Sequence, residues 1–229
     1  MLFFTPLRML HIMLLDRLTL FTIKSNKRLR MTAERCFMIV YKEYNRARAV
    51  AYARRWALSR NPLFTNFAGR GGDCTNFASQ CIYAGSCQMN FTPDFGWYYI
   101  TDNDRSPAWS SVEYFYDFIT GNPTFASQNG GIGPYGIEVD SKGALEGDIV
   151  QLADESGDFY HTLIVTGFSE GNTLVSAHTN DALDRPLSSY GYSSLRYIHI
   201  EGVRIEVADD TCFFDLIEGV SLGLPEADA

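Results

Sequence analysis

The sequence has few cysteines, and their arrangement does not suggest a metal site. Its 229 residues include five cysteines at irregular spacing and without a CxxC pair: Cys36, Cys74, Cys81, Cys87 and Cys212. This number is too small for the disulfide framework of a small secreted domain. The four histidines lie far from any cysteine cluster in the sequence, which argues against a structural zinc. The odd count leaves at least one thiol free unless it pairs between chains.

Long uninterrupted hydrophobic runs are also missing. The apolar stretch at residues 1–20 is broken by Arg8, Asp16 and Arg17. A transmembrane helix needs about twenty apolar residues, and a secretory signal needs an unbroken apolar core followed by a cleavage site. We therefore predict no integral membrane span and no conventional signal peptide, and we leave the localisation open.

Residues 1–30 allow three interpretations. They can be an amphipathic leader or surface helix, an ordinary packed helix, or an upstream extension before a natural start at Met31. We favour the extension. Residues 31–229 are then interpreted as a single domain, because apolar residues make up 46% of the chain and its length suits one sizeable core.

Positive charge is scarce in the body of the chain. Residues 61–229 hold 6 Lys and Arg against 24 Asp and Glu, whereas residues 1–60 hold 13 against 3. Nucleic-acid binding needs clustered Lys and Arg, so we predict no nucleic-acid partner. An acidic body suits a neutral or basic substrate, and it is equally typical of an ordinary soluble surface.

The periodicity of apolar residues changes along the chain. Residues 44–60, 74–84 and 109–119 have helical patterns, the second closed by Gly85, whereas residues 148–152, 160–167, 173–178 and 195–200 read as strands. Helices followed by an antiparallel sheet predict an α+β fold.

Cys74 has the most distinctive setting of the five cysteines. It follows a glycine-rich loop and an N-cap candidate, Asp73, so we expect it in the first turn of a helix. Free backbone N–H groups at that position favour an anion and can bind the oxyanion of a tetrahedral intermediate. The alternative is that Cys74 is a small buried hydrophobic residue, which is the usual role of a free cysteine.

A thiolate nucleophile needs a base, and three histidines are candidates. His161 opens an apolar strand just after a polar turn, at a position typical of a cleft edge. His178 closes the next strand, where it would share one face with Ser176 and Asn180. His199 alternates with apolar residues and fits a core or edge histidine better.

Several motifs resemble the putative amidase domain found in many Firmicutes. The most specific is the run from Asp73 to Cys81, DCTNFASQC, preceded by Gly71-Gly72. Trp109, the pair Gly147-Asp148, the run HTLIVTG beginning at His161 and the run HTND beginning at His178 follow in the same order as in the family. The resemblance covers about residues 41–201.

That family is related to the papain-like superfamily, which includes NlpC-type cell-wall peptidases and cysteine- and histidine-dependent amidohydrolase/peptidase domains. The resemblance therefore implies a papain-like fold, with N-terminal helices packed on a small antiparallel sheet or half-barrel. It implies Cys74 as nucleophile, His161 as base, and His178 or alternatively Asn180 as the orienting group. It also places Asp73 at the substrate-binding edge, although a plain N-cap is at least as good an interpretation.

The expected reaction is hydrolysis of an amide or peptide bond through a thioester, without metal or cofactor. Peptidoglycan stem peptides are the leading substrate by resemblance, which also allows a cell-envelope or secreted role. A groove lined by Trp109 and by other aromatic residues could bind such a ligand; these are more often core residues. The alternatives are a Cys-His acyltransferase and a catalytically silent binding domain on the same scaffold.

Overall fold

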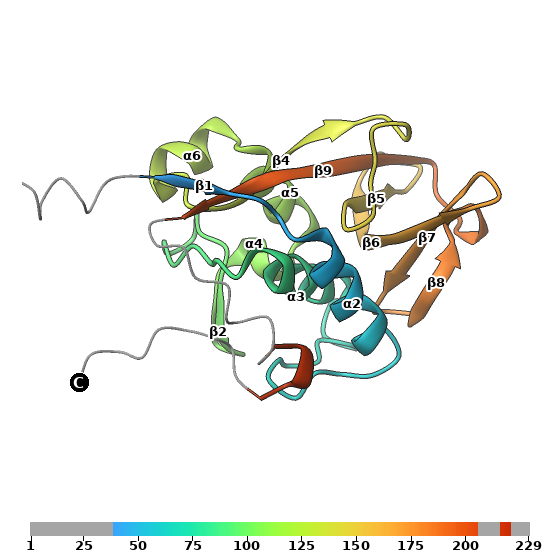
Figure 1. Cartoon of the computed structure of the whole chain (residues 1–229), viewed down its shortest axis with the longest axis horizontal. Coiled ribbons are helices and arrows are strands. Elements are labelled where there is room, and N and C mark those ends of the chain that lie inside the picture. Colours follow the sequence, from blue (N-terminus) through green and yellow to red (C-terminus); the bar gives the residue numbers. More distant parts are fainter. Residues whose placement is uncertain (1–38, 206–215, 221–229) are drawn as a thin grey trace, which may run out of the picture. The chain divides into compact units, whose positions relative to one another are not determined.

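The computed structural model describes residues 39–205 and 216–220, so the predicted leader at residues 1–30 lies outside it. Figure 1 shows the order of the elements. The first are β1 (Val40–Lys42), α2 (Arg46–Trp56) and α3 (Cys74–Ser86). A mixed part follows, with β2 (Tyr99–Thr101), β3 (Asp104–Arg105), α4 (Pro107–Ser110), α5 (Val112–Thr120) and α6 (Pro123–Asn129). Next come β4 (Gly133–Val139), β5 (Ile149–Ala153), β6 (Phe159–Ser169), β7 (Asn172–Ala177), β8 (Ala182–Pro186), the 3-10 turn η1 (Leu187–Ser189) and β9 (Ser194–Ile205).

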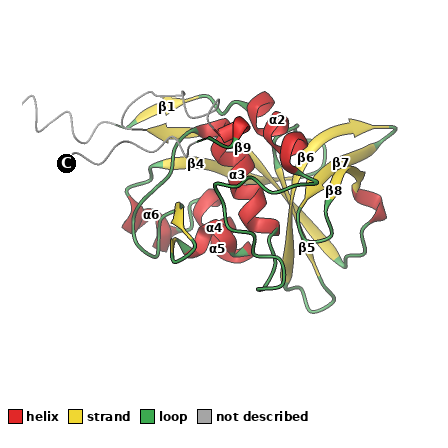
Figure 2. Ribbon diagram, turned by 90° about the horizontal axis from the view of Figure 1, so that it is seen from below, coloured by secondary structure: helices red, strands yellow, loops and turns green. Residues whose placement is uncertain are grey.

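The main sheet is antiparallel throughout. Its strand order is β1-β9-β5-β6-β7-β8, and β4 also pairs with β9. The 12-residue strand β9 therefore serves as a shared partner for β1, β4 and β5 along its length. Figure 2 shows helices α3, α4 and α5 gathered beside the strands. The predicted α+β class, with an antiparallel half-barrel sheet, is confirmed.

Two hydrophobic clusters lie on the two faces of β6. Ile164 belongs to the larger cluster, which contains the buried residues of α2 and α3. Leu163 and Val165 belong to a smaller cluster with residues of β5 and β7. Because side chains alternate along a strand, the same division determines which face each polar residue of β6 occupies.

Helix α3 is buried along its whole length, from Cys74 to Ser86. It does not end at Gly85 as predicted but at Ser86, and Cys87 adopts the left-handed conformation, with φ of 50°, that closes it. Gly85 serves a different purpose. A Cβ atom there would lie 2.3 Å from Cε2 of Tyr44 and 2.9 Å from the carbonyl oxygen of Asn45, so glycine lets α3 pack closely against the start of α2.

The helical pattern predicted for residues 109–119 contains two helices rather than one. Ser111 has an extended backbone, with φ of −106° and ψ of 136°, and separates α4 from α5. Phe115 and Ile119 are buried as predicted, and Phe118 is buried with them. The break turns Trp109 into the core while α5 packs near the sheet.

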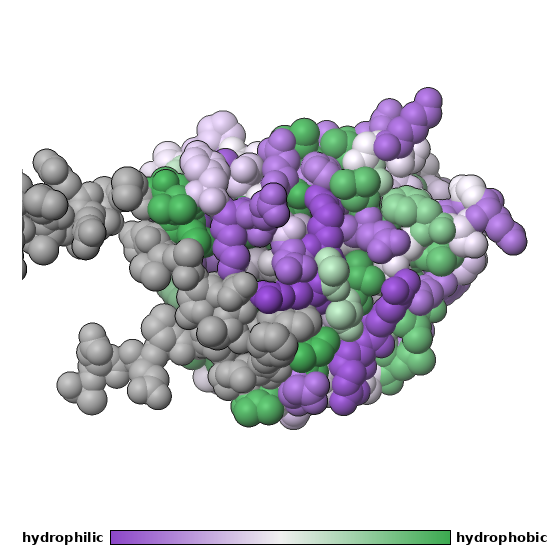
Figure 3. All heavy atoms as spheres, viewed as in Figure 1, coloured by the Kyte–Doolittle hydropathy of each residue, from purple (hydrophilic) through white to green (hydrophobic). Residues whose placement is uncertain are grey.

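The exposed side of α2 is hydrophilic. Arg54 and Arg55 are exposed on this helix, and hydrophilic side chains spread over the middle of the face shown in Figure 3. Within the described ranges, none of the helices has both the length and the apolar character required to cross a membrane.

Candidate active site

Cys74 is the first residue of α3, where a helix presents unpaired backbone N–H groups. Its side chain is 8% exposed, whereas Cys81, two turns further along, is completely buried. Both are free thiols. Burial raises the pKa of the Cys81 thiol well above its ordinary value. The helix thus carries one buried but slightly exposed cysteine at its N-terminus, where negative charge is favoured, and one completely buried cysteine whose thiol stays protonated.

Two threonine hydroxyls join the start of α3 to the start of β6. Thr75 Oγ1 and Thr162 Oγ1 lie 2.9 Å apart, and both residues are buried. Thr75 directly follows Cys74, and Thr162 directly follows His161. This hydrogen bond therefore holds the two chain segments that carry the predicted nucleophile and base against each other.

The same hydroxyls continue a buried hydrogen-bond chain toward the sulfur. Gln151 Nε2 donates to Thr162 Oγ1 at 3.2 Å, which leaves the Thr162 hydroxyl hydrogen for Thr75. Thr75 Oγ1 lies 3.8 Å from Cys74 Sγ. Gln151 is itself fixed by Arg196, whose Nε donates to Gln151 Oε1 at 2.7 Å. When Gln151 donates to Thr162 and Thr162 donates to Thr75, the Thr75 hydroxyl can donate its own hydrogen to an anionic Cys74 sulfur.

His161 lies on the face of β6 that carries Leu163 and Val165, opposite to the face of Thr162. It is paired across the sheet with Leu152 of β5 and is 8% exposed. In the described part of the chain, its imidazole makes no hydrogen bond, either to the Cys74 sulfur or to another group. The structure therefore brings the two segments together and leaves both reactive side chains unbonded to each other.

Two tyrosine rings and one arginine surround the His161 imidazole. Its ring centroid lies 6.1 Å from that of Tyr160, nearly parallel, and 6.1 Å from that of Tyr190. Burial lowers the pKa of His161 to about 4, and the positive charge of Arg185 contributes to the lowering. The ring is therefore neutral at pH 7, as a proton acceptor must be.

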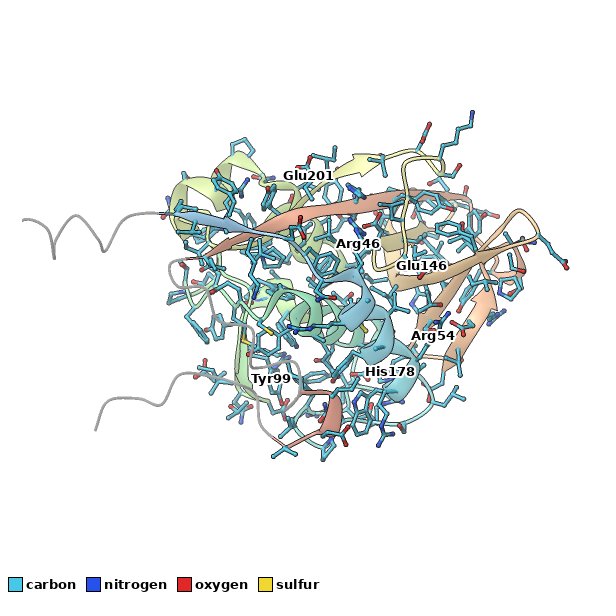
Figure 4. All side chains as sticks on the ribbon, in the orientation of Figure 1. Arg46, Arg54, Tyr99, Glu146, His178 and Glu201 are labelled. Atoms are coloured by element: carbon cyan, nitrogen blue, oxygen red, sulfur yellow. The ribbon has the colours of Figure 1, made fainter. Side chains whose placement is uncertain are left out.

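His178 lies beyond the end of β7, in a turn, and both of its ring nitrogens are occupied. Nδ1 lies 2.7 Å from Asp73 Oδ2, and Nε2 lies 3.0 Å from the carbonyl oxygen of Trp56. The ring also stacks on Phe77, at 3.9 Å between centroids. Figure 4 shows His178 beside the C-terminal end of α2. Since neither nitrogen is left for His161, these bonds do not support the predicted orienting role of His178.

Asp73 is completely buried, which removes it from the substrate-binding edge where the resemblance placed it. Its side chain makes no N-cap hydrogen bond either. Instead Oδ1 accepts from the backbone N–H of Phe67 at 3.0 Å and from Asn76 Nδ2 at 2.7 Å, while Oδ2 faces His178 and, at 3.4 Å, Arg60 Nε. A buried carboxylate needs such partners to offset its desolvation.

The turn at residues 178–181 is fastened to the start of α3. Asp73 donates its backbone N–H to Thr179 Oγ1 at 2.7 Å, and Arg60 pairs with Asp181 at 2.8 Å. Asn180, the alternative orienting residue, is exposed and has a φ of 66°. The expectation that His178 and Asn180 share one strand face is wrong, because β7 ends at Ala177 and the left-handed turn follows at once.

Trp109 is also completely buried, so the predicted contact with a substrate is corrected to a core role. Its indole Nε1 donates to Asn76 Oδ1 at 2.8 Å, and its ring packs 4.9 Å from Trp97 and 5.9 Å from Tyr99. These three aromatics line the hydrophobic core under α3 rather than an open groove.

A surface cavity of about 430 Å³ lies at the end of β5 and the start of β6. It is lined by Tyr160, whose ring stacks beside His161, and by a set of exposed residues: Asp154, Glu155, Gly191, Tyr192 and Ser193. In residues 39–205 and 216–220, no group of three His, Cys, Asp or Glu side chains is arranged to hold a metal ion.

Sequence reasoning missed the residues that join the site together. Thr75, Thr162 and Gln151 meet only through the pairing of β5 with β6 and the packing of α3, and none has a reactive side chain that would single it out. The single available signal was position, since both threonines directly follow a predicted catalytic residue.

Comparison with known proteins supports a family assignment. Residues 43–200 match the model of the family described as "Putative amidase domain". The chain is also 32% identical over 174 residues to the uncharacterized protein YhbB of Bacillus subtilis (strain 168), across 74% of this chain and 52% of YhbB. The chain thus spans about half the length of that relative. No solved structure matches.

The family name indicates amide hydrolysis in general terms. The match includes the start of α3 and the strands β5 and β6, whose contact has been described above. The chain therefore belongs to the putative amidase domain family.

Proposed function

We propose that the protein is a cysteine amidohydrolase of papain-like type, with Cys74 as nucleophile and His161 as general base. The observation that carries the proposal is the hydrogen bond between Thr75 and Thr162, which holds the two residues' chain segments together. Family membership supports amide hydrolysis, and the residues that precede the two threonines, Cys74 and His161, supply a thiol and an imidazole to perform it.

His161 is a better base than His178 because of their hydrogen bonds. Both nitrogens of His178 face polar partners, a carboxylate and a carbonyl oxygen, so the ring is held beside Asp73 and neither nitrogen is free to act on a substrate. His161 is neutral, and in the described residues no hydrogen bond restrains its ring. Because His161 lies on the face of β6 opposite to Thr162, the mechanism requires a movement of the β6 segment, and not only of the ring, that brings the imidazole to Cys74.

The reaction then proceeds by acyl transfer in two steps. His161 accepts the Cys74 proton as the sulfur attacks the amide carbonyl, and backbone N–H groups in the first turn of α3 stabilise the oxyanion. The C–N bond breaks as His161 returns the proton to the leaving amine, which leaves a thioester on Cys74. Water, deprotonated by His161, attacks the thioester and releases the carboxylic acid and the thiol.

The roles of the other predicted site residues change in this proposal. His178 and Asp73 position the start of α3, and a Cys-His dyad replaces the predicted triad. We propose a peptide-like amide as substrate, with peptidoglycan stem peptides first, on the strength of the motif resemblance to cell-wall peptidases.

Digestion of purified peptidoglycan, followed by mass analysis of the fragments, tests the activity and the bond together. The wild type is expected to release fragments that each differ from the parent by hydrolysis of one amide bond. Cys74→Ala is expected to release none and to remain folded, whereas the matched variant Cys81→Ala, the same change on the same helix, keeps the activity.

Undiminished release of fragments by Cys74→Ala would refute the cysteine mechanism. If the wild type cleaves other peptide amides but leaves peptidoglycan intact, the substrate assignment is refuted and the mechanism stands. Added amine acceptors that appear in the product would show acyl transfer in place of hydrolysis.

A further inference from the structure

Arg185 and Tyr190 form a polar pair beside His161 that the reaction steps above do not use. Arg185 belongs to β8, and Tyr190 follows the turn η1. The guanidinium carbon of Arg185 lies 4.1 Å from the centroid of the Tyr190 ring, which in turn packs 6.1 Å from the ring of His161. The pair therefore adjoins the candidate base on the face of β6 that carries it.

Arg185 is held in a fixed orientation by uncharged groups. Its Nε donates to Ser189 Oγ at 2.7 Å and its Nη2 donates to the Ser189 carbonyl oxygen at 2.9 Å. Ser189 Oγ is anchored in turn to the Pro186 carbonyl oxygen at 2.7 Å. Two hydrogen bonds and a stacked ring together pre-organise the guanidinium without neutralising it.

The absence of an acidic partner distinguishes Arg185 from most arginines in the described ranges. Six of them form ion pairs with Asp or Glu side chains: Arg46, Arg54, Arg60, Arg70, Arg105 and Arg196. Within the same ranges, no carboxylate pairs with Arg185, and its Nη1 makes no hydrogen bond. A fixed cation with a donor to spare can bind an anion that comes from outside the chain.

Tyr190 adds a second unused donor. Its hydroxyl is buried, and the Arg185 guanidinium beside it can only donate a hydrogen bond, so in the described part of the chain the hydroxyl hydrogen has no acceptor. A buried phenol hydroxyl usually has a partner, because leaving it unpaired costs about 1–3 kcal/mol. A ligand oxygen accepting from both Tyr190 and Arg185 would satisfy it.

We propose that Arg185 and Tyr190 form a subsite that binds a carboxylate of the substrate close to the amide bond that is cleaved. This inference rests on the proposed function and narrows its substrate class to peptide-like amides that carry a carboxylate. The cavity of about 430 Å³ is lined by Tyr160, whose ring packs beside His161, and gives room for the rest of such a ligand.

Binding of a carboxylate there changes the charge that surrounds the base. The titratable and charged groups that pack around His161 are Tyr160 on its own strand, Tyr190 after η1 and Arg185 on β8; Asp154 and Glu155 line the adjoining cavity. The charge of Arg185 disfavours an imidazolium at His161, and a bound anion offsets that charge. A bound substrate carboxylate would therefore make His161 a stronger base.

Nuclear magnetic resonance of the histidine side chains tests this inference without turnover. The chain has four histidines, and the His161 signal is identified by its loss in His161→Gln. The pH titration of this signal is followed in the Cys74→Ala background, with N-acetylglycine or with the neutral N-acetylglycinamide, at equal ionic strength. We expect the carboxylate to raise the pKa of His161 by about one pH unit and the amide to leave it unchanged.

Arg185→Gln provides the decisive comparison. It is expected to raise the pKa of His161 in the free protein and to abolish the response to N-acetylglycine, whereas Arg204→Gln, at the other end of the sheet, keeps the wild-type response. An equal response to both probes, no response, or a carboxylate response that survives Arg185→Gln would overturn the subsite. None of these signals depends on hydrolysis. The subsite can therefore be refuted while the Cys74 mechanism stands, and the Cys74 mechanism can be refuted while the subsite stands.

Discussion

Nδ1 of His178 lies 2.7 Å from Oδ2 of Asp73, and both side chains are buried. Asp73 directly precedes the proposed nucleophile, Cys74. The pair ties the turn after β7 to the residue before Cys74. The pair thus fixes where the helix begins, and with it the position of the sulfur. His178, which looks catalytic in the sequence, is bound in this structure by a carboxylate and a carbonyl oxygen.

Replacing His178 by alanine is expected to destabilise the protein by about 3–5 kcal/mol, because it leaves the buried Asp73 carboxylate without one of its two closest partners. Urea unfolding measures the loss. The matched change is Asp181→Asn, which removes the exposed partner of Arg60 and is expected to cost less than about 1 kcal/mol. Equal losses of unfolding free energy in the two variants would show that the buried pair stabilises the fold no more than the exposed ion pair does.

The hydroxyl contact between Thr75 and Thr162 is expected to appear as a coupling in a double-mutant cycle. Thr75→Val and Thr162→Val each remove the same bond, so the loss in the double variant is expected to be smaller than the sum by about 1 kcal/mol. Thr101 is exposed on β2, so Thr101→Val combined with Thr75→Val serves as the uncoupled control, in which the two losses are expected to add. Strict additivity of Thr75→Val and Thr162→Val would rule out a stabilising contact.

His161 is expected to make the protein sensitive to mild acid. Its pKa falls from 6.5 in the unfolded chain to about 4 in the folded protein, so the unfolded chain binds the extra proton first as the pH is lowered. The stability linked to His161 is therefore complete above pH 6.5 and is lost between there and about pH 4, by roughly 3 kcal/mol in total.

Urea unfolding at a series of pH values checks this linkage. The free energy of unfolding of the wild type is expected to decline over that interval more steeply than that of His161→Gln, which lacks the titrating group. Parallel curves for the two proteins would mean that the His161 ring is not protected from protonation by the fold.

The sequence could predict the elements whose signals are local. Helices α2 and α3 follow from apolar periodicity and from the residues that flank them, and β5, β6, β7 and β9 follow from short apolar runs between turns. Strand β8 was missed because Asp184 and Arg185 interrupt its apolar pattern, and β4 because glycine and proline open it.

The site could be predicted only in part, for a related reason. Cys74 and His161 stand out by chemical type and by local position, which a single sequence displays. The partners of His178 depend on tertiary packing, since Asp73 is 105 positions away in the chain and Trp56 is 122 positions away. Burial of Trp109 likewise depends on how α3 and α4 pack, and no local pattern gives it.

The most direct test of the central claim is the rate at which iodoacetamide alkylates individual cysteines of the native protein near pH 7, followed by peptide mass mapping. Cys74 is expected to react much faster than the buried Cys81, and His161→Gln is expected to slow Cys74 by about tenfold or more while leaving Cys81 unchanged. Equal rates for the two cysteines, or a Cys74 rate that does not depend on His161, would contradict the account.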